Sequence, residues 1–409
     1  MRYKQIIAQA PLLTFVIASF VFFVEASAYL CRPYAPTARR TRRTTLGESS
    51  RTMLPRKQFL AYAAASSLAF MFNSQPAFAF SSSRSAPQAS VSDVAYRALT
   101  LDFGPGVTVP VAVWHPIGNN DLLTETATYN HCISVAKIGD LLAGWDFIPS
   151  FASRNFVLKP SLASAKVYAA PRTNILPLPS SGPVVILAHG FLGSRFDLSH
   201  LAEALASEGF IVVSPEFPES LAASYPRTEG MDRAAITDRL LDTLQRDWSI
   251  QPTSYGIIGH SLGTGTVLNT GDDSWTRVCI AGKPSERASP ALFIGSTNDG
   301  AVSLSRIGAL PKEYIKIDEN SLGTANSPLP SKAALIFDRP DAPNHISFLA
   351  EGPNDAMVQF LSPLLPVAQA MDIPVLDFDK YARVRDSRQT AEVVVPLVSS
   401  YLRQNMKMN

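Results

Sequence analysis

The stretch Tyr255-Gly-Ile-Ile-Gly-His-Ser-Leu-Gly263 joins an apolar run to a Gly-x-Ser-x-Gly pattern and leads into a helical segment. A serine on a sharp strand-to-helix turn has a strained backbone, so the residues two positions away must be small. Gly259 and Gly263 meet that need. The turn lifts the Ser261 hydroxyl above a sheet, where the helix N-terminus stabilises developing negative charge. The stretch predicts a serine nucleophile; a glycine-rich turn with a structural serine is the alternative.

The segments around this stretch alternate between strand and helix patterns. Residues 183–188 are continuously apolar, as expected of a strand buried on both faces. The predicted strands are 96–101, 109–114, 183–188, 210–214, 255–258, 277–281, 291–294 and 333–337, and the predicted helices are 197–208, 231–248, 262–269 and 390–403. This alternation predicts an α/β fold, with one mostly parallel, doubly wound sheet flanked by helices.

One long segment breaks the alternation. Residues 117–180 contain Pro and Ser clusters without a clear period, apart from a weak helical stretch at 134–145. Segments of this length without regular structure are usually insertions or lids. We therefore expect an irregular insertion or lid at 117–180, within a folded domain at 90–409.

A second motif follows the predicted strand 183–188. His189-Gly-Phe-Leu-Gly193 and the Gly-x-Ser-x-Gly turn together resemble the α/β-hydrolase superfamily, whose triad runs in the chain order Ser, acid, His. The resemblance covers 94–409 in layout and 183–345 in motifs. It implies an oxyanion hole made by the backbone N–H groups of Phe191 and Leu262, with Gly190 in the oxyanion loop and Gly259 and Gly263 in the elbow.

His345 is the candidate base because it alone of the six histidines lies after Ser261. It follows the predicted strand 333–337 by a short loop, where the superfamily places its base. Its role would be to take the Ser261 proton and return it to the leaving alcohol.

The candidate acid is Asp299, in the turn after the apolar strand 291–294. This turn resembles the acid loop of the superfamily. Asp299 would hold the imidazole in the required tautomer and offset its charge. Asp338, Asp341 and Glu286 are competitors, and each could equally be a solvated loop carboxylate.

The other histidines and the cysteines carry no ligand pattern. His189 is interpreted as a brace for the oxyanion loop, and His260 as a packing neighbour of the elbow. No metal-ligand spacing links His115, His131 and His200 to each other or to Cys132 and Cys279. We therefore expect neither a metal nor a cofactor.

Composition excludes several classes of protein. With 46% hydrophobic and 17% charged residues, the 409-residue chain is neither disordered nor fibrous, and three cysteines are too few for a disulfide scaffold. The net charge of +2 divides into +8 for residues 1–79 and −6 for residues 80–409. A mildly acidic folded part argues against nucleic-acid binding.

The basic N-terminal part is interpreted as a targeting sequence. Residues 1–28 have a charged start, a short apolar run and Ala26-Ser27-Ala28, as in a secretory signal peptide; a membrane anchor is the alternative. Residues 29–57 have the composition of a transit peptide, and 58–80 resemble a second, thylakoid-type signal or an anchor.

This stacked order resembles the presequences of algae with complex plastids. We therefore expect a location in the plastid of such an alga, in the thylakoid lumen or at the thylakoid membrane, with the secretory pathway as the alternative. Cys31 would be removed together with this presequence.

The resemblance also suggests a substrate class. Residues 109–116 and 196–215 resemble platelet-activating-factor acetylhydrolase-like and dienelactone-hydrolase-like enzymes, which implies a serine ester hydrolase. Chlorophyllases have a similar layout, but their elbow reads Gly-His-Ser-Arg-Gly-Gly, where this chain has Leu262 and Thr264 at the Arg and second Gly positions.

Two apolar segments, 141–156 and 346–376, favour a lipophilic ester and leave peripheral membrane contact open, although ordinary core packing also explains them. Chlorophyll, galactolipid and phospholipid esters are candidate substrates. An acyltransferase with the same triad and a catalytically inactive binding module remain alternatives. The oligomeric state is not predicted.

Overall fold

The computed structural model describes residues 94–117, 127–134, 136–137, 140–141, 153–158, 167–169, 177–223, 225, 231–319, 328–361 and 385–406. Ser90–Asn409 form one compact unit. The predicted targeting segments lie outside the described residues. In the parts that are described, no helix has the length and hydropathy needed to cross a membrane.

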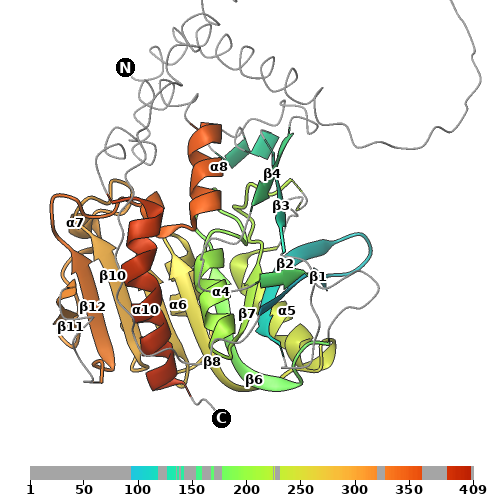
Figure 1. Ribbon diagram of the computed structural model, residues 1–409. Helices are drawn as coiled ribbons and strands as arrows, with labels where there is room; N and C mark the ends of the chain where they lie inside the picture. The colour runs from blue at the N-terminus through green and yellow to red at the C-terminus, as the bar shows by residue number, and fades with distance from the viewer. Residues whose placement is uncertain are drawn as a thin grey trace, which may run out of the picture. The chain divides into compact units, whose positions relative to one another are not determined.

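A ten-stranded sheet forms the centre of this unit (Figure 1). Its order is β11-β12-β10-β9-β8-β6-β7-β2-β1-β5. The strands are β1 (Val94–Asp102), β2 (Thr108–Pro116), β5 (Val167–Ala169), β6 (Ser181–Ala188), β7 (Ile211–Pro215), β8 (Gln251–His260), β9 (Thr276–Ile280), β10 (Ala291–Ser296), β11 (Ile315–Ile317) and β12 (Lys332–Phe337). Strand β2 runs antiparallel to β1 and β7, and the other pairings are parallel. The predicted α/β class with a mostly parallel sheet is confirmed.

The order of the central strands determines where a site can form. After β6 the chain adds β7 on one side, and then crosses back to add β8 on the other side of β6. The connections that leave β6 and β8 therefore diverge, and in open α/β sheets this reversal leaves a crevice at the carboxyl ends of the strands. The motif at 189–193 follows β6 directly, and the motif at 259–263 begins in the last two residues of β8.

Helices cover both faces of the sheet. Helices α4 (Ser199–Ser207) and α10 (Ser387–Asn405) pack together on one face, and α5 (Arg233–Arg246) and α6 (Gly263–Asn269) pack together on the other (Figure 1). The side chains of Asp232 and Asp386 cap α5 and α10, and Gly209 follows α4 with φ 99°. Such caps satisfy backbone N–H groups that a helix end leaves free.

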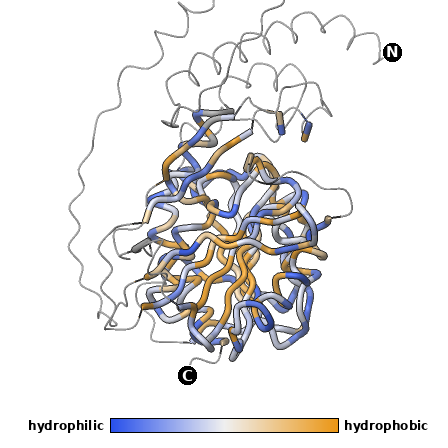
Figure 2. Tube along the Cα trace, turned by 90° about the vertical axis from the view of Figure 1, so that its right-hand side faces the viewer, coloured by the Kyte–Doolittle hydropathy of each residue, from blue (hydrophilic) through white to orange (hydrophobic). Residues whose placement is uncertain are grey.

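The core consists of the apolar side chains of the central strands and their helices. Val184, Val213, Ile257 and Phe293 have no exposed surface. Figure 2 shows hydrophobic residues concentrated along the central strands and hydrophilic ones at the periphery. A parallel sheet covered on both faces requires such apolar strands, and it provides a rigid base for the loops at its edge.

The expectation that 117–180 is irregular is wrong where this segment is described. Strands β3 (Tyr129–Ser134) and β4 (Ser153–Leu158) form a separate two-stranded antiparallel sheet, and β5 adds a parallel edge strand beside β1. The paired strands are short and polar and lie about 20 residues apart in sequence, so no local pattern predicts them. Of the weak helix predicted at 134–145, residues 136–137 and 140–141 are helical, and most of its remainder lies outside the described residues.

Three further elements have no counterpart in the sequence-based assignment. They are α7 (Leu304–Ile307), β11 and α8 (Glu351–Leu361), of which α8 lies near β3 and β4 in Figure 1. Helix α10 also continues through Pro396 and is longer than predicted. These elements extend the sheet edge and the region next to the predicted base.

Candidate active site

The predicted nucleophile lies on a tight turn between β8 and α6. Ser261 has φ 55°, a left-handed conformation that costs a non-glycine residue about 1–3 kcal/mol. A β-carbon at Gly259 would lie 2.3 Å from the carbonyl oxygen of Gly263, and one at Gly263 would lie 2.0 Å from that of Ala188. Neither position accepts a side chain. The Ser261 N–H donates to the Ile280 carbonyl at 2.9 Å, which anchors the turn to β9.

The predicted base and acid lie in direct contact. His345 Nδ1 is 2.8 Å from Asp299 Oδ2, and both residues are buried. Asp299 Oδ1 accepts from the N–H groups of Ala301 and Val302, at 2.9 and 2.7 Å, which fixes the carboxylate. A carboxylate accepts hydrogen bonds, so Nδ1 carries the proton and Nε2 keeps its lone pair. His345 can therefore act as a base through Nε2.

The competing carboxylates have other surroundings. Asp338 is exposed, Asp341 lies 3.6 Å from Arg385 and Glu286 lies 3.9 Å from Lys283. Among the described residues, none of the three bonds to His345. Their geometry fits surface ion pairs or solvated loops, and Asp299 is the carboxylate that the fold brings to the histidine.

Uncharged side chains hold the loop that carries His345. Asn344 Oδ1 accepts from the two backbone N–H groups that follow His345, both at 2.9 Å. Ser296 donates to the carbonyl of residue 343, and Asn298 donates to that of residue 342 at 3.0 Å. Both donors lie at the end of β10, beside Asp299. The acid loop and the base loop are therefore held together by more than the Asp299–His345 contact.

The nucleophile and the base are near each other without bonding. His260, which precedes Ser261, has its ring centroid 4.7 Å from that of His345. Within the described parts of the chain, Ser261 Oγ makes no hydrogen bond to His345. Catalytic hydrogen bonds are often long in ligand-free enzymes and tighten around substrate.

The predicted oxyanion loop lies directly beside the nucleophile. A β-carbon at Gly190 would lie 3.0 Å from Ser261 Cβ, so the loop approaches this closely because residue 190 has no side chain. Among the described residues, the backbone N–H groups of Phe191 and Leu262 have no hydrogen-bond partner. Free N–H groups on both sides of a serine are the arrangement that an oxyanion needs.

The neighbouring N–H groups of this loop are occupied. Leu192, with φ 60°, donates its N–H to the Glu219 carbonyl at 3.1 Å, and Gly193 donates to the Gly190 carbonyl at 3.3 Å. Leu221 in turn donates to the Gly193 carbonyl at 3.1 Å. The loop after β7 therefore holds the oxyanion loop along its length.

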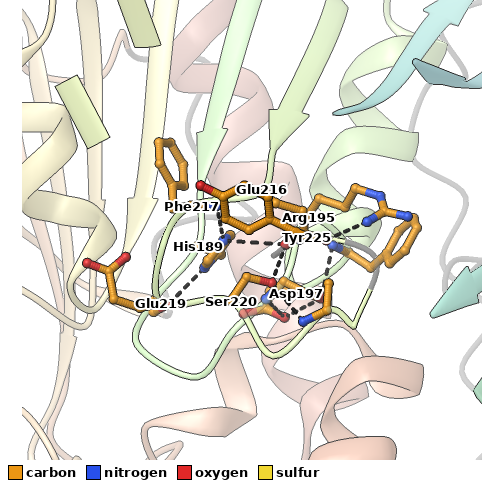
Figure 3. A network of polar contacts seen from close by, with 12 residues as sticks. His189, Arg195, Asp197, Glu216, Phe217, Glu219, Ser220 and Tyr225 are labelled. Atoms are coloured by element: carbon orange, nitrogen blue, oxygen red, sulfur yellow. Dashed lines mark hydrogen bonds and ion pairs between the residues drawn. The ribbon is translucent and has the colours of Figure 1, made fainter. Parts of the chain in front are cut away.

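A buried carboxylate, Glu216, connects these two loops (Figure 3). It is 0% exposed and accepts from the Arg195 backbone N–H at 3.2 Å, from Arg195 Nη1 at 2.5 Å and from the Ser220 hydroxyl. His189 Nε2 is 3.6 Å away. Removing one partner from a buried ion pair leaves an uncompensated charge and is strongly destabilising. Glu216 is therefore important for holding the two loops together.

His189 is a brace, as interpreted from the sequence. Its Nδ1 lies 2.8 Å from the Gly190 carbonyl, and its Nε2 accepts from the Phe217 N–H at 2.9 Å. These partners require a neutral ring with the proton on Nδ1. Burial, and secondarily the charge of Arg233, holds the pKa of His189 well below its usual value. Its ring joins the oxyanion loop to the segment after β7.

A second buried carboxyl, Asp197, supports the end of the oxyanion loop. Its Oδ1 accepts from the N–H and hydroxyl of Ser194, at 3.0 and 3.1 Å. Its Oδ2 would lie 2.2 Å from a β-carbon at Gly193. Burial, reinforced by the charge of Glu216 but opposed by the Ser194 bonds, raises the pKa of Asp197 to about 8. At neutral pH this carboxyl is mostly protonated.

The described residues contain no cluster of three or more His, Cys, Asp or Glu side chains that could hold a metal ion.

One protein-family model matches part of the chain. The family model for platelet-activating factor acetylhydrolase, isoform II, matches residues 152–235, which include the oxyanion loop and Glu216. No curated protein sequence matches the chain.

Several solved structures are similar to this chain. A ferulic acid esterase from Streptomyces cinnamoneus has 16% identity and a TM-score of 0.39, over 78% of this chain and 92% of that one. A structure described as a dienelactone hydrolase from Klebsiella pneumoniae has 13% identity and a TM-score of 0.32, over 66% and 97%. A serine hydrolase without a lid from Xanthomonas campestris has 14% identity and a TM-score of 0.32, over 66% and 94%.

The matched family model agrees with the resemblance to the α/β-hydrolase superfamily that the motifs carry. The strand order and the turn geometry of Ser261 support it independently of these matches. Sequence reasoning missed Glu216, Arg195, Asp197 and Asn344. A charged residue directly after an apolar strand, as Glu216 is after β7, was the available signal.

Proposed function

We propose that residues 90–409 form a serine carboxylic-ester hydrolase with Ser261 as nucleophile, His345 as base and Asp299 as the carboxylate that orients it. The observation that carries this proposal is the 2.8 Å contact between His345 Nδ1 and Asp299, beside a serine with φ 55°. An exposed turn supplies the hydroxyl, and a fixed tautomer supplies the base.

The reaction follows from these positions. His345 Nε2 takes the Ser261 proton as Oγ forms a bond to the ester carbonyl carbon, and the carbonyl oxygen becomes an oxyanion. The N–H groups of Phe191 and Leu262 bind that oxygen, and each such donor is worth about 2.7–4 kcal/mol in the transition state. His345 then protonates the leaving alcohol as its C–O bond breaks. Water, deprotonated by the same nitrogen, releases the acid from the acyl-enzyme.

Features around Ser261 support a lipophilic ester as substrate. The Leu262 side chain, next to the nucleophile, is 43% exposed and offers apolar surface to a substrate. Helix α8, which belongs to the apolar segment 346–376, packs against β4, since a β-carbon at Gly352 would lie 3.5 Å from Leu158. Phe348 and Leu349 are instead core residues, each 1% exposed. We therefore place the substrate near Leu262, β4 and α8.

Within this class, esters of a plastid are our preferred substrates, because the N-terminal 80 residues have the composition of a plastid targeting sequence. The ester of chlorophyll and the acyl esters of galactolipids or phospholipids are the alternatives, and peripheral contact with a membrane fits either. Transfer of the acyl group to an alcohol is a second candidate reaction, because water and an alcohol attack the same acyl-enzyme.

The test is a substrate panel on the purified chain. Chlorophyll a, a galactolipid, a phospholipid and p-nitrophenyl esters of increasing acyl length are assayed with and without an added alcohol. We expect turnover that rises with acyl length and is abolished in Ser261→Ala, while the surface control Ser305→Ala keeps the wild-type rate. Turnover confined to the shortest esters would contradict the lipophilic substrate. An ester product formed from the alcohol would identify an acyltransferase.

A further inference from the structure

His260 is a buried histidine at the centre of the site, between the nucleophile and the base. It ends β8 and is 3% exposed. Its Nε2 lies 3.0 Å from the backbone carbonyl oxygen of His345. A carbonyl oxygen can only accept, so Nε2 carries the proton and Nδ1 is a lone pair. The ring is thus a donor from the nucleophile turn to the loop of the base.

The same ring contacts the site on three sides. Its centroid is 4.7 Å from that of His345 and 6.5 Å from that of Phe348. A β-carbon at Gly190 would lie 3.3 Å from His260 Nδ1 and 3.0 Å from Ser261 Cβ. His260 therefore fills the space shared by the oxyanion loop, the nucleophile and the base.

The charge state of His260 suits this position. Burial, and then the neighbouring charge of His345, lowers the pKa of His260 well below its usual value, so the ring is neutral at working pH. His345 becomes an imidazolium each time it accepts the Ser261 proton. A second cation 4.7 Å away would oppose that step. A neutral ring supplies a hydrogen-bond donor without adding a positive charge.

The bond from His260 complements the other restraints on the base. Asn344, Ser296 and Asn298 hold the loop from within itself and from β10. The His260 bond spans 85 residues of sequence and ties His345 to the residue next to Ser261. It is a direct restraint between the nucleophile turn and the base loop, and small displacements between reacting groups slow catalysis strongly.

We propose that His260 is a positioning residue, whose Nε2–H bond to the His345 carbonyl sets the distance between Ser261 and His345. The inference rests on the proposed esterase function. It goes beyond that function in assigning a task to a histidine that takes no part in the proton transfers. It also predicts that a neutral donor at this place, and not the imidazole itself, is what the site requires.

The test compares variants of the full chain that differ in this donor. His260→Gln keeps an N–H group at the place of Nε2, His260→Leu fills the space without a donor, and His260→Asn has a donor that is too short to reach. His115→Leu is the matched control, since His115 is a buried histidine that bonds to the carbonyl of its neighbour Pro116. A cooperative unfolding transition in urea is first measured for each variant, to establish that the variant is folded.

We expect kcat to fall about 10- to 100-fold in His260→Leu and His260→Asn with KM within about 2-fold, and to stay within about 3-fold of wild type in His260→Gln and His115→Leu. The downfield proton resonance of the His345–Asp299 bond should shift in the first two variants and not in the last two. Should His260→Leu not fold, His260→Asn and His260→Gln still give the comparison.

Two results would overturn the inference while leaving the esterase intact: wild-type kcat in His260→Leu, or equal losses in His260→Gln and His260→Leu. A wild-type chain without any ester turnover would instead overturn the proposed function and this inference with it.

Discussion

The loops on the two sides of Ser261 are held by different chemistry. The oxyanion loop rests on buried ionisable groups, with Glu216, Arg195, Asp197 and His189 each at most 9% exposed. The loop of His345 is held mainly by uncharged side chains, those of Asn344, Ser296, Asn298 and the neutral His260, and His345 itself contacts the Asp299 carboxylate.

This difference separates stability from catalysis. Removing the partner of a buried charge strongly lowers the stability of the fold, so substitutions on the oxyanion side should mainly lower the free energy of unfolding. Neutral side chain–backbone bonds are worth about 0.5–1.5 kcal/mol each, so damage on the base side should first appear in the rate. Four substitutions test this division, from the largest expected effect to the smallest.

Asp299→Asn should have the largest effect on catalysis. The amide can donate to His345 Nδ1, which favours the wrong tautomer and removes the base at Nε2. We expect kcat to fall about 10³- to 10⁴-fold while the urea midpoint changes little. A variant that unfolds as readily as it loses activity would show that the base side is also a stability element.

Glu216→Gln should have the largest effect on stability. It leaves the Arg195 guanidinium buried without its counter-ion, and breaking such a pair costs about 3–5 kcal/mol. We expect a large drop in the urea midpoint, together with a lower kcat. The exposed pair of Arg239 with Asp247 provides the control, because Asp247→Asn should cost less than about 1 kcal/mol. Equal losses in the two variants would contradict the role of Glu216.

Asp197→Asn should change how stability depends on pH. The folded-state pKa of Asp197 is raised to about 8 from an ordinary value of 3.8, so the folded chain holds a proton that the unfolded chain releases. This contribution is complete below about pH 4 and is lost as pH rises toward 8, by up to about 1.4 kcal/mol per pH unit. The free energy of unfolding in urea should therefore increase for the variant, relative to the wild type, as the pH rises from 5 to 8. If the free energies of unfolding of the two proteins changed with pH in parallel, Asp197 would not hold a proton in the folded chain.

Asn344→Ala should have the smallest effect of the four. It removes one acceptor from two backbone N–H groups that follow His345. We expect a loss of about 1–2 kcal/mol in unfolding and a fall of about 10-fold in kcat, since the base moves without losing its tautomer. An unchanged kcat would show that the bonds from Ser296, Asn298 and His260 suffice to hold the loop.

The sequence predicts the features of this site that short-range geometry determines. Gly259 and Gly263 must lack side chains because backbone atoms lie within 2.3 Å of their β-positions, and that requirement is visible as a motif. The apolar strands of the buried sheet are visible for a similar reason, as continuous runs of apolar residues.

Contacts between distant segments are not visible in the same way. Arg195 meets Glu216 across 21 residues, and β3 pairs with β4 across about 20 residues. A charged residue that becomes buried has the same letter as one on the surface, so only the fold shows that Glu216 supports the oxyanion loop.

The most direct test of the central claim is the site of covalent labelling by a fluorophosphonate in the full chain. The account predicts one phosphonate per chain on Ser261, located by peptide mass spectrometry, with labelling slowed about 10³-fold or more in His345→Ala. Labelling at another residue, or an undiminished rate in His345→Ala, would contradict it.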